Sequence, residues 1–239
     1  MTSAIILAGG LGTRLRDTVP DLPKPMAPLN GRPFLEYQLD YWIAQGVRHF
    51  ILSIGYRSEA IVSHFGETYG GASLEYAVET EPLGTGGGLL LAMDLLRGDD
   101  AFLLLNGDTF FEVNLGQLAA FHSARRSDWT LALFCTREVG RYMGPTVDRD
   151  GRILSLRSEM GNADRLANGG VYLVSPTIIR TSNVLARQRV SLEDEIMPGA
   201  LAAGGRFFGL ECQGRFIDIG VPEDYRRAAT FVTGREAAK

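Results

Sequence analysis

The sequence has few of the residues that build metal clusters, disulfide frameworks and membrane spans. Only two cysteines and three histidines occur among its 239 residues. Cys135 and Cys212 stand in apolar, strand-like runs without metal-ligand spacing, so we expect them to be buried, reduced thiols. No apolar run approaches the ~20 residues that a membrane helix needs, and no basic segment precedes an apolar stretch at the N-terminus. We therefore expect a cytoplasmic protein with no membrane partner.

A surplus of positive charge is also missing. The formal net charge is -4, so we expect no broad basic surface and no nucleic-acid partner. Hydrophobic residues make up 45% of the chain and charged residues 22%, which is typical of a globular protein with a substantial core. The length is compatible with a single α/β domain.

Short apolar segments alternate with helical patterns through the first half of the chain. The alternation predicts an α/β protein with a three-layer, mostly parallel, Rossmann-like sheet. The expected strands are Ala4–Ala8, Phe50–Ile54, Leu74–Val78, Ala101–Asn106 and Thr130–Cys135. The expected helices are Pro33–Gln45, Ser58–Phe65, Gly84–Leu96 and Leu115–Ala124.

The alternation loosens after Thr136. The segment "GPTVDRDGRILSLR" predicts a β-hairpin that turns at Asp150-Gly151. Ser191 and Asp194 have the spacing of a capping box, which predicts a helix that begins at Ser191. Two further strands, Gly170–Val174 and Arg206–Glu211, and a helix from Pro222 complete the expected elements.

A glycine loop, "AGGLGTRLRD", follows the first strand. It lacks the third glycine of a dinucleotide-binding fingerprint, because Leu15 stands there, and it lacks the Gly-Lys-Ser/Thr of a P-loop. Glycine nevertheless lets backbone N–H groups approach a phosphate closely, and Arg14 and Arg16 add planar forks of donors. Lys24 follows between two prolines that stiffen its backbone. These features together predict a phosphate-binding loop.

The string "LAGGLGTRLRD…LPKPMAPLNGRP" resembles the signature of the sugar-1-phosphate nucleotidyltransferases. Five later stretches also resemble segments of that family: "EPLGTGGGL", "LLNGDTFF", "NGGVYLV", "SLEDEIMP" and "FIDIGVPEDY". The resemblance runs from Ile5 to about Ala228 and is strongest to guanylyltransferases that act on heptose 1-phosphate, followed by mannose-1-phosphate guanylyltransferases. It implies the nucleotide-diphospho-sugar transferase fold in one domain, 1–239, with a nucleotide-binding half of about 1–135 and a sugar-binding half of about 136–230.

The resemblance implies that an NTP and a sugar 1-phosphate react to give an NDP-sugar and pyrophosphate, with Mg²⁺ as cofactor. It assigns catalytic roles to Arg14, Lys24, Asp108 and Asp218, with Arg14 on the β- and γ-phosphates and Lys24 on the α-phosphate or the sugar phosphate. Asp108 and Asp218 would hold the metal, since Mg²⁺ prefers carboxylate and phosphate oxygens. The expected nucleotide-binding residues are Leu7, Ala8, Gly9, Gly10, Gly12, Thr13, Arg14, Glu79, Pro82, Gly84, Thr85, Asn106 and Gly107.

Glu79 stands where the family places a base-reading side chain. A carboxylate accepts two hydrogen bonds from the N1–H and N2–H₂ groups of guanine, which favours GTP. Cytosine also presents an amine to a carboxylate, so CTP remains open.

The sugar phosphate is expected at Lys24, Glu159, Asn168, Gly170 and Glu193. In many relatives a lysine stands just before the Asn-x-Gly strand, and that lysine binds the sugar phosphate. This chain has Met160 there, and either Arg157 or Arg165 could replace that lysine.

The favoured function is transfer of GMP to heptose 1-phosphate for capsule or lipopolysaccharide synthesis. The alternatives are a mannose-1-phosphate guanylyltransferase, a cytidylyl- or thymidylyltransferase that uses glucose 1-phosphate, and a non-catalytic regulatory subunit. A dehydrogenase is disfavoured by Leu15. The sequence leaves the oligomeric state open, a homo-oligomer included.

Overall fold

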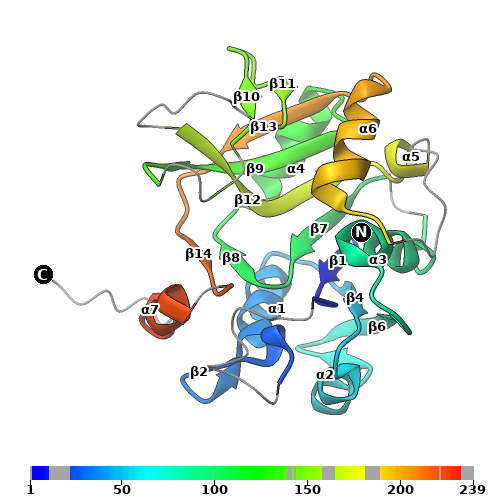
Figure 1. The fold of residues 1–239 in the computed structure, drawn as a ribbon, viewed down its shortest axis with the longest axis vertical. Coiled ribbons are helices and arrows are strands. Elements are labelled where there is room, and N and C mark those ends of the chain that lie inside the picture. Colours follow the sequence, from blue (N-terminus) through cyan, green and yellow to red (C-terminus); the bar gives the residue numbers. More distant parts are fainter. Residues whose placement is uncertain are drawn as a thin grey trace, which may run out of the picture.

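An eight-stranded sheet forms the centre of the protein in the computed structural model (Figure 1). The structure describes residues 2–10, 22–98, 100–138, 142, 144–157, 165–180, 189–220 and 222–232. The strand order is β13-β9-β12-β7-β1-β4-β6-β5. The strands are β1 (Ala4–Leu7), β4 (His49–Ile54), β5 (Thr68–Tyr69), β6 (Ala72–Val78), β7 (Phe102–Asn106), β9 (Trp129–Thr136), β12 (Arg165–Val174) and β13 (Phe207–Glu211).

Most neighbouring strands of this sheet run parallel. β1 is parallel to both β4 and β7, β4 to β6, and β13 to β9. The exceptions are β12, which is antiparallel to β7 and β9, and the short edge strand β5. The predicted mostly parallel α/β sheet is therefore confirmed. Its strands come from both proposed halves of the chain, and the division into two halves stays a prediction.

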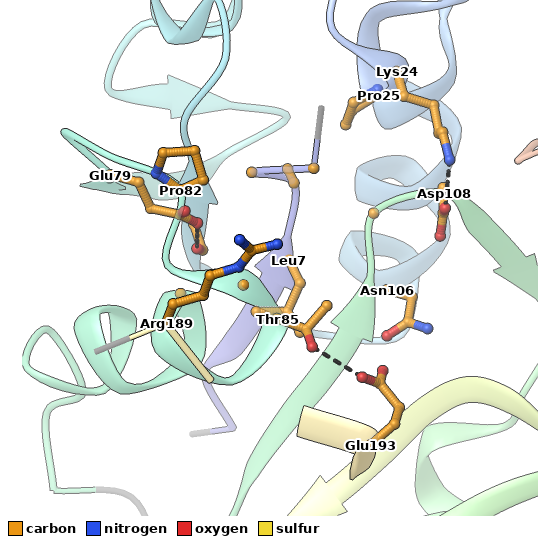
Figure 2. Close-up of a pocket in the computed structure, with 17 residues that line it drawn as sticks. Leu7, Lys24, Pro25, Glu79, Pro82, Thr85, Asn106, Asp108, Arg189 and Glu193 are labelled. Carbon is orange, nitrogen blue, oxygen red and sulfur yellow. Dashed lines mark hydrogen bonds and ion pairs between the residues drawn. The ribbon is translucent and has the colours of Figure 1, made fainter. Parts of the chain in front are cut away.

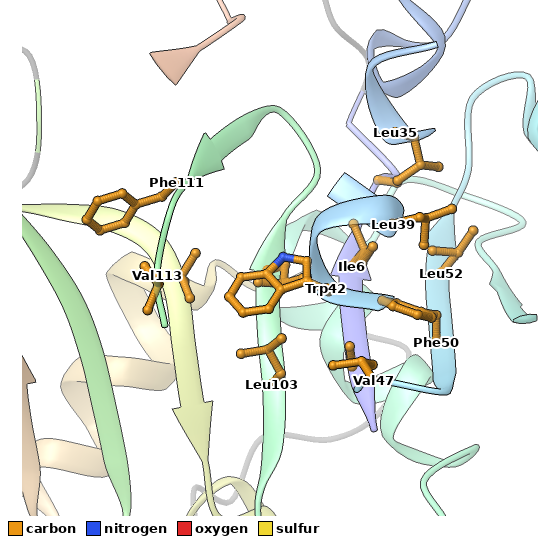
Figure 3. Close-up of a cluster of buried hydrophobic side chains, with 14 of the residues drawn as sticks. Ile6, Leu35, Leu39, Trp42, Val47, Phe50, Leu52, Leu103, Phe111 and Val113 are labelled. Carbon is orange, nitrogen blue, oxygen red and sulfur yellow. The ribbon is translucent and has the colours of Figure 1, made fainter. Parts of the chain in front are cut away.

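Helices cover both faces of the sheet and give three layers. The helices of one layer are α1 (Phe34–Ala44), α2 (Ser58–Phe65) and α4 (Leu115–Ala124), and those of the other are α3 (Gly84–Met93), α5 (Pro176–Arg180) and α6 (Met197–Ala202). Two separate hydrophobic clusters lie between the sheet and these layers. Figure 3 shows the first cluster, in which Leu39 and Trp42 of α1 lie beside Ile6 and Phe50 of the sheet.

The strand sequences account for burial on both faces. Successive side chains of a strand point to opposite faces, so a strand covered on both sides reads as a continuous apolar run. In β1, Ile5 belongs to one cluster and Ile6 to the other, and both have no exposed surface. The run Phe102–Asn106 is buried up to Leu105, and only its last residue is partly exposed.

Several smaller elements surround the sheet. They are the one-turn helix η1 (Lys24–Met26), the pairs β2 (Pro28–Leu29) with β3 (Arg32–Pro33), β8 (Thr109–Phe111) with β14 (Phe216–Asp218), and β10 (Thr146–Val147) with β11 (Ile153–Ser155), and the helix α7 (Pro222–Val232). The β10–β11 pair confirms the predicted hairpin. The β8–β14 pair was not predicted.

The helix that begins after Ser191 differs in detail from the prediction. Its first turn is a single π-helical turn, η2 (Leu192–Ile196), and α6 follows it directly. Ser191 caps the turn, because its side-chain oxygen accepts from the Asp194 amide. The second hydrogen bond of the capping box is accepted by Glu195, whose Oε1 atom takes the Ser191 amide at 2.9 Å. The wider π turn places Glu195, rather than Asp194, over the start of the helix.

Both cysteines are free, but the prediction of burial is wrong for Cys135, which is exposed, while Cys212 is half-buried. Cys135 is the second-last residue of β9, and the run of buried residues in this strand ends before it, at Phe134. Among the described residues, no helix is long and apolar enough to cross a bilayer.

An ion pair holds β14 against β8. Glu112 directly follows β8 and Arg215 directly precedes β14, and their side chains meet through two bonds of 3.0 and 2.5 Å. Hydrogen bonds from the Arg215 guanidinium lower the pKa of Glu112 below its ordinary value of 4.5.

Replacing Glu112 with glutamine tests the contribution of this ion pair to stability. A carboxylate whose folded-state pKa is depressed stabilises the fold above the unfolded pKa and loses that effect as the pH falls through the folded pKa. We expect Glu112→Gln to lower the free energy of unfolding by about 1 kcal/mol at neutral pH. The difference from the unmodified protein should begin to shrink near the ordinary pKa of 4.5 and should vanish only below the lower folded-state pKa of Glu112, whereas Glu67→Gln, at an exposed site, changes nothing. A difference that is constant across pH, measured by urea unfolding, would contradict the assignment.

Candidate active site

A cavity of about 490 Å³ opens at the carboxyl ends of β1, β4 and β7. Ligand sites of open parallel α/β sheets lie at this edge. Thirteen of the predicted site residues line the cavity: Leu7, Ala8, Gly9, Gly10, Lys24, Glu79, Pro82, Gly84, Thr85, Asn106, Gly107, Asp108 and Glu193. Figure 2 shows that they come from segments far apart in the sequence. Gly12, Thr13, Arg14 and Glu159 lie outside the described residues.

Lys24 and Asp108 form an ion pair at one end of the cavity. The Lys24 Nζ atom donates to Asp108 Oδ2 at 2.8 Å, and the two side chains are 17% and 37% exposed. Lys24 begins η1 directly after Pro23, whose extended backbone sets the direction of the chain into that turn. Asp108 follows β7 in the turn that leads into β8. The pair places a cation and an anion at a cavity wall that is partly open to solvent.

Asp218 lies next to this ion pair, although it is not part of the cavity wall. β14 pairs with β8 in the register that sets Asp218 opposite Thr109, and the Ile219 amide donates to the Asp108 carbonyl at 2.9 Å. A methyl group placed on Gly220 would lie 2.6 Å from Asp218 Oδ1 and 3.4 Å from Lys24 Nζ. The Lys24 ammonium and the two carboxylates therefore converge from three distant parts of the sequence.

The two aspartates fit a hard divalent cation. Among the described residues no cluster of three or more histidine, cysteine, aspartate or glutamate side chains occurs. Mg²⁺ does not require one, because it is commonly held by one or two carboxylates together with phosphate oxygens and water. Asp108 and Asp218 supply such a donor set, and Lys24 offsets part of its charge through the ion pair with Asp108.

Glu79 lies at the opposite end of the cavity, after β6. Its carboxylate accepts from Ser53 Oγ at 3.3 Å and from the Leu83 amide at 3.0 Å, so each carboxylate oxygen has one fixed partner and one free lone pair. A methyl group on Gly9 or on Gly88 would come within 2.2 and 2.8 Å of Glu79 Oε1. Glycine at both positions thus makes room for this carboxylate at the cavity wall.

Thr85 joins the start of α3 to the segment before η2. Its hydroxyl donates to Glu193 Oε2 at 2.9 Å and accepts from the Leu192 amide at the same distance. The Val190 carbonyl accepts from the Gly86 amide at 2.9 Å. These bonds hold Glu193 at the rim of the cavity. Arg189 also lines the cavity, and Figure 2 shows its guanidinium between the Glu79 side and Leu7.

Asn168 and Gly170 lie behind the cavity wall rather than in it. Asn168 donates to the Tyr172 hydroxyl at 2.7 Å, and its Oδ1 accepts from the Gly170 amide at 3.1 Å. Gly170 has a φ of +70°, and a methyl group there would lie 2.8 Å from Asn106 Nδ2. Burial raises the pKa of Tyr172, and the negative charges of Glu193 and Asp108 contribute. The tyrosine therefore stays neutral, with its hydroxyl oxygen accepting from Asn168.

Neither arginine proposed to replace the missing lysine lines this cavity. Arg157 is exposed and pairs with Asp194, while Arg165 in β12 donates to the Glu138 carbonyl at 3.1 Å. Their proposed role stays a prediction.

Four further residues line the cavity but were not predicted from the sequence: Pro25, Ser53, Gly88 and Arg189. The sequence does single out Ser53, because it is a polar residue inside the apolar strand β4. The sequence also singles out Gly88, since a glycine-rich helix indicates close packing. Arg189 follows no motif and reaches the cavity only because the Val190 backbone bonds to Leu83.

Comparison with known proteins gives consistent matches over nearly the whole chain. The family model described as "Nucleotidyl transferase" matches residues 3–235. The chain is 39% identical to D-glycero-alpha-D-manno-heptose 1-phosphate guanylyltransferase of Aneurinibacillus thermoaerophilus, over 94% of this chain and 96% of that protein. It is 34% identical to mannose-1-phosphate guanylyltransferase of Mycobacterium tuberculosis, over 97% of this chain and 65% of that longer protein.

A solved structure has the same fold. The crystal structure of HddC from Yersinia pseudotuberculosis complexed with GMP-PN matches with a TM-score of 0.83 and 32% identity, over 97% of this chain and 99% of that chain. The family match, the curated relatives and the fold agree with the resemblance noted in the sequence. The chain belongs to the nucleotidyl transferase family.

Proposed function

We propose that this protein transfers GMP from GTP to a heptose 1-phosphate and releases pyrophosphate. The observation that carries the proposal is the cavity itself, which has a carboxylate suited to guanine at one end and Lys24 with Asp108 at the other, where Asp218 lies just behind the wall. Relatives named as heptose 1-phosphate guanylyltransferases support the substrate pair. The product would serve capsule or lipopolysaccharide synthesis in the cytoplasm.

The proposed reaction is one in-line displacement at the α-phosphorus of GTP. An oxygen of the sugar phosphate forms the new P–O bond, the bond to the β-phosphate oxygen breaks, and pyrophosphate leaves with the electron pair. Such chemistry depends mainly on positioning and on electrostatic stabilisation. Lys24 would move from Asp108 onto the α-phosphate or the sugar phosphate, and Asp108 and Asp218 would hold Mg²⁺. The cation would neutralise phosphate charge.

Guanine recognition would use two side chains at the Glu79 end of the cavity, Glu79 and Arg189. Glu79 would accept from N1–H and N2–H₂ through the lone pairs that Ser53 and Leu83 leave free. Arg189, which points into the same space, would donate to O6 and N7, the acceptor pair that arginine forks commonly read. Adenine lacks the O6 acceptor and the N2 amine, so this arrangement favours GTP.

The sugar would lie beyond the phosphates, towards Asn168, Gly170 and Glu193. Thr85 fixes the Glu193 carboxylate, which would accept from a sugar hydroxyl. Mannose 1-phosphate is the second candidate substrate, because a mannose-1-phosphate guanylyltransferase is 34% identical.

The proposed reaction is tested by a substrate matrix. GTP, ATP, CTP, UTP and dTTP are each combined with heptose, mannose and glucose 1-phosphates, and pyrophosphate release is measured. We expect the highest kcat/KM for GTP with heptose 1-phosphate. Preference for another nucleotide or sugar would replace the proposed pair, and no release with any combination would favour a non-catalytic subunit.

Asp108→Asn tests the cation site. Loss of the carboxylate charge should lower kcat by about 10²-fold or more, because transition-state charge is no longer offset. Asp40→Asn, which removes a surface carboxylate that pairs with Arg32, serves as the matched control. The melting temperature of both variants should stay close to that of the unmodified protein. Activity of Asp108→Asn near that of the control would refute the role.

Glu79→Gln tests base recognition. The amide keeps one acceptor for the Leu83 amide but turns a donor towards the guanine amine, so kcat/KM for GTP should fall by about tenfold or more. The much lower activity with ATP should change little. Glu75→Gln, on the same strand, is the control, since Glu75 pairs with His49 and Arg97 away from the cavity. Equal losses with GTP and ATP would remove Glu79 from base reading.

A further inference from the structure

A buried glutamine lies beneath the turn that carries Asp108. Gln38 belongs to α1 and is only 3% exposed. Its Nε2 group donates to the Asn106 carbonyl at 2.9 Å and also to the Thr109 carbonyl. These two carbonyls stand directly before and after the Gly107-Asp108 dipeptide. One amide group of α1 therefore forms hydrogen bonds with the residues at both ends of the turn.

The rest of the turn is bonded from other directions. The Gly107 amide donates to the Leu7 carbonyl of β1 at 2.9 Å, and the Asp108 carbonyl accepts from the Ile219 amide at 2.9 Å. Gln38 supplies the third attachment, from the helical layer opposite α3. Each attachment comes from a different element, so the turn is fixed against β1, the end of β14 and α1 at once.

The amide is the group that this position requires. Two carbonyl oxygens need two N–H donors, and a carboxylate or an apolar side chain offers none. A buried amide carries a desolvation cost, which its bonds have to offset. Gln38 Oε1 has no hydrogen-bond partner within the described part of the chain, and Gln38 lines a small cavity of about 10 Å³ with Thr109 and Gly170. A side chain selected for packing alone would leave no such unpaired atom.

We propose that Gln38 is a positioning residue for Asp108: by joining the Asn106 and Thr109 carbonyls it sets the direction in which the Asp108 carboxylate meets Lys24 and the cation. The inference rests on the proposed function, in which Asp108 is a cation ligand. Gln38 itself touches no substrate. Residues that orient ligands in this way commonly change metal affinity or activity about 10- to 100-fold when they are replaced.

Gln38→Met tests the proposal, because methionine keeps the length of the side chain and removes the amide, whose Oε1 atom has no partner among the described residues, so that the two bonds from Nε2 are the ones lost. Gln45→Met is the matched control. Gln45 caps the C-terminal end of α1. Its Nε2 group donates to the Val113 carbonyl at 3.1 Å and its Oε1 atom accepts from the Leu115 amide at 2.8 Å, away from the Asp108 turn. Both variants lose two hydrogen bonds to a loop, so a merely structural role predicts similar effects.

Two measurements separate the variants. We expect kcat of Gln38→Met to fall about tenfold with KM for GTP changed less than about twofold, because Glu79 and the base end of the cavity are intact. Amide hydrogen exchange of Gly107 and Ile219 should accelerate about tenfold in Gln38→Met and stay unchanged in Gln45→Met. Equal kcat values and equal exchange in the two variants would overturn the proposal.

The outcome is distinguishable from failure of the proposed function. If the unmodified protein releases no pyrophosphate with any substrate, the proposed function fails, and hydrogen exchange alone decides whether Gln38 holds the turn. If Gln38→Met does not fold, NMR of the unmodified protein replaces it. Slow exchange of both Gln38 Nε2 protons supports the two hydrogen bonds from Gln38 to the turn, and rapid exchange of both overturns the proposal.

Discussion

The candidate site depends on a short antiparallel pairing between β8 and β14. Three residue pairs place Asp218 opposite Thr109, and this register brings a carboxylate from the end of the chain to Asp108, which is 110 positions earlier (218 − 108). The Glu112–Arg215 ion pair lies at the other end of the same ladder. A slip of one residue would turn Asp218 to the opposite face, since side chains alternate along a strand. The charge arrangement around Lys24 therefore requires this register.

The two ends of the cavity are built by different means. At the Lys24 end, opposite charges are paired and partly open to solvent, which leaves the lysine free to exchange its carboxylate partner for a phosphate. At the Glu79 end, a hydroxyl and a backbone amide fix a carboxylate between two glycines. A mobile charge suits phosphate transfer, whereas a fixed acceptor pair suits recognition of one base. The sheet edge between β1, β4 and β7 keeps the two ends at a constant separation.

The sequence predicts most of the fold because its strands are continuous apolar runs bounded by clear turn and helix signals. The helices Ser58–Phe65 and Leu115–Ala124 agree residue for residue with the structure. The β8–β14 pair was missed because three-residue strands carry too little periodicity to be recognised. Lys24, Asp108 and Glu79 were found through motifs, but Gln38 and Arg189 could not be, since their positions depend on long-range packing. Cys135 was expected to be buried because its run is apolar, yet burial along β9 ends one residue before it, at Phe134.

A crystal structure with a non-hydrolysable GTP analogue and Mn²⁺ tests the central claim most directly, because anomalous scattering locates the metal without reference to a starting structure. The account predicts one manganese peak in contact with carboxylate oxygens of both Asp108 and Asp218, phosphates within reach of Lys24, and guanine against Glu79. A manganese ion bound away from the two aspartates, or a base bound at the opposite end of the cavity from Glu79, would contradict it.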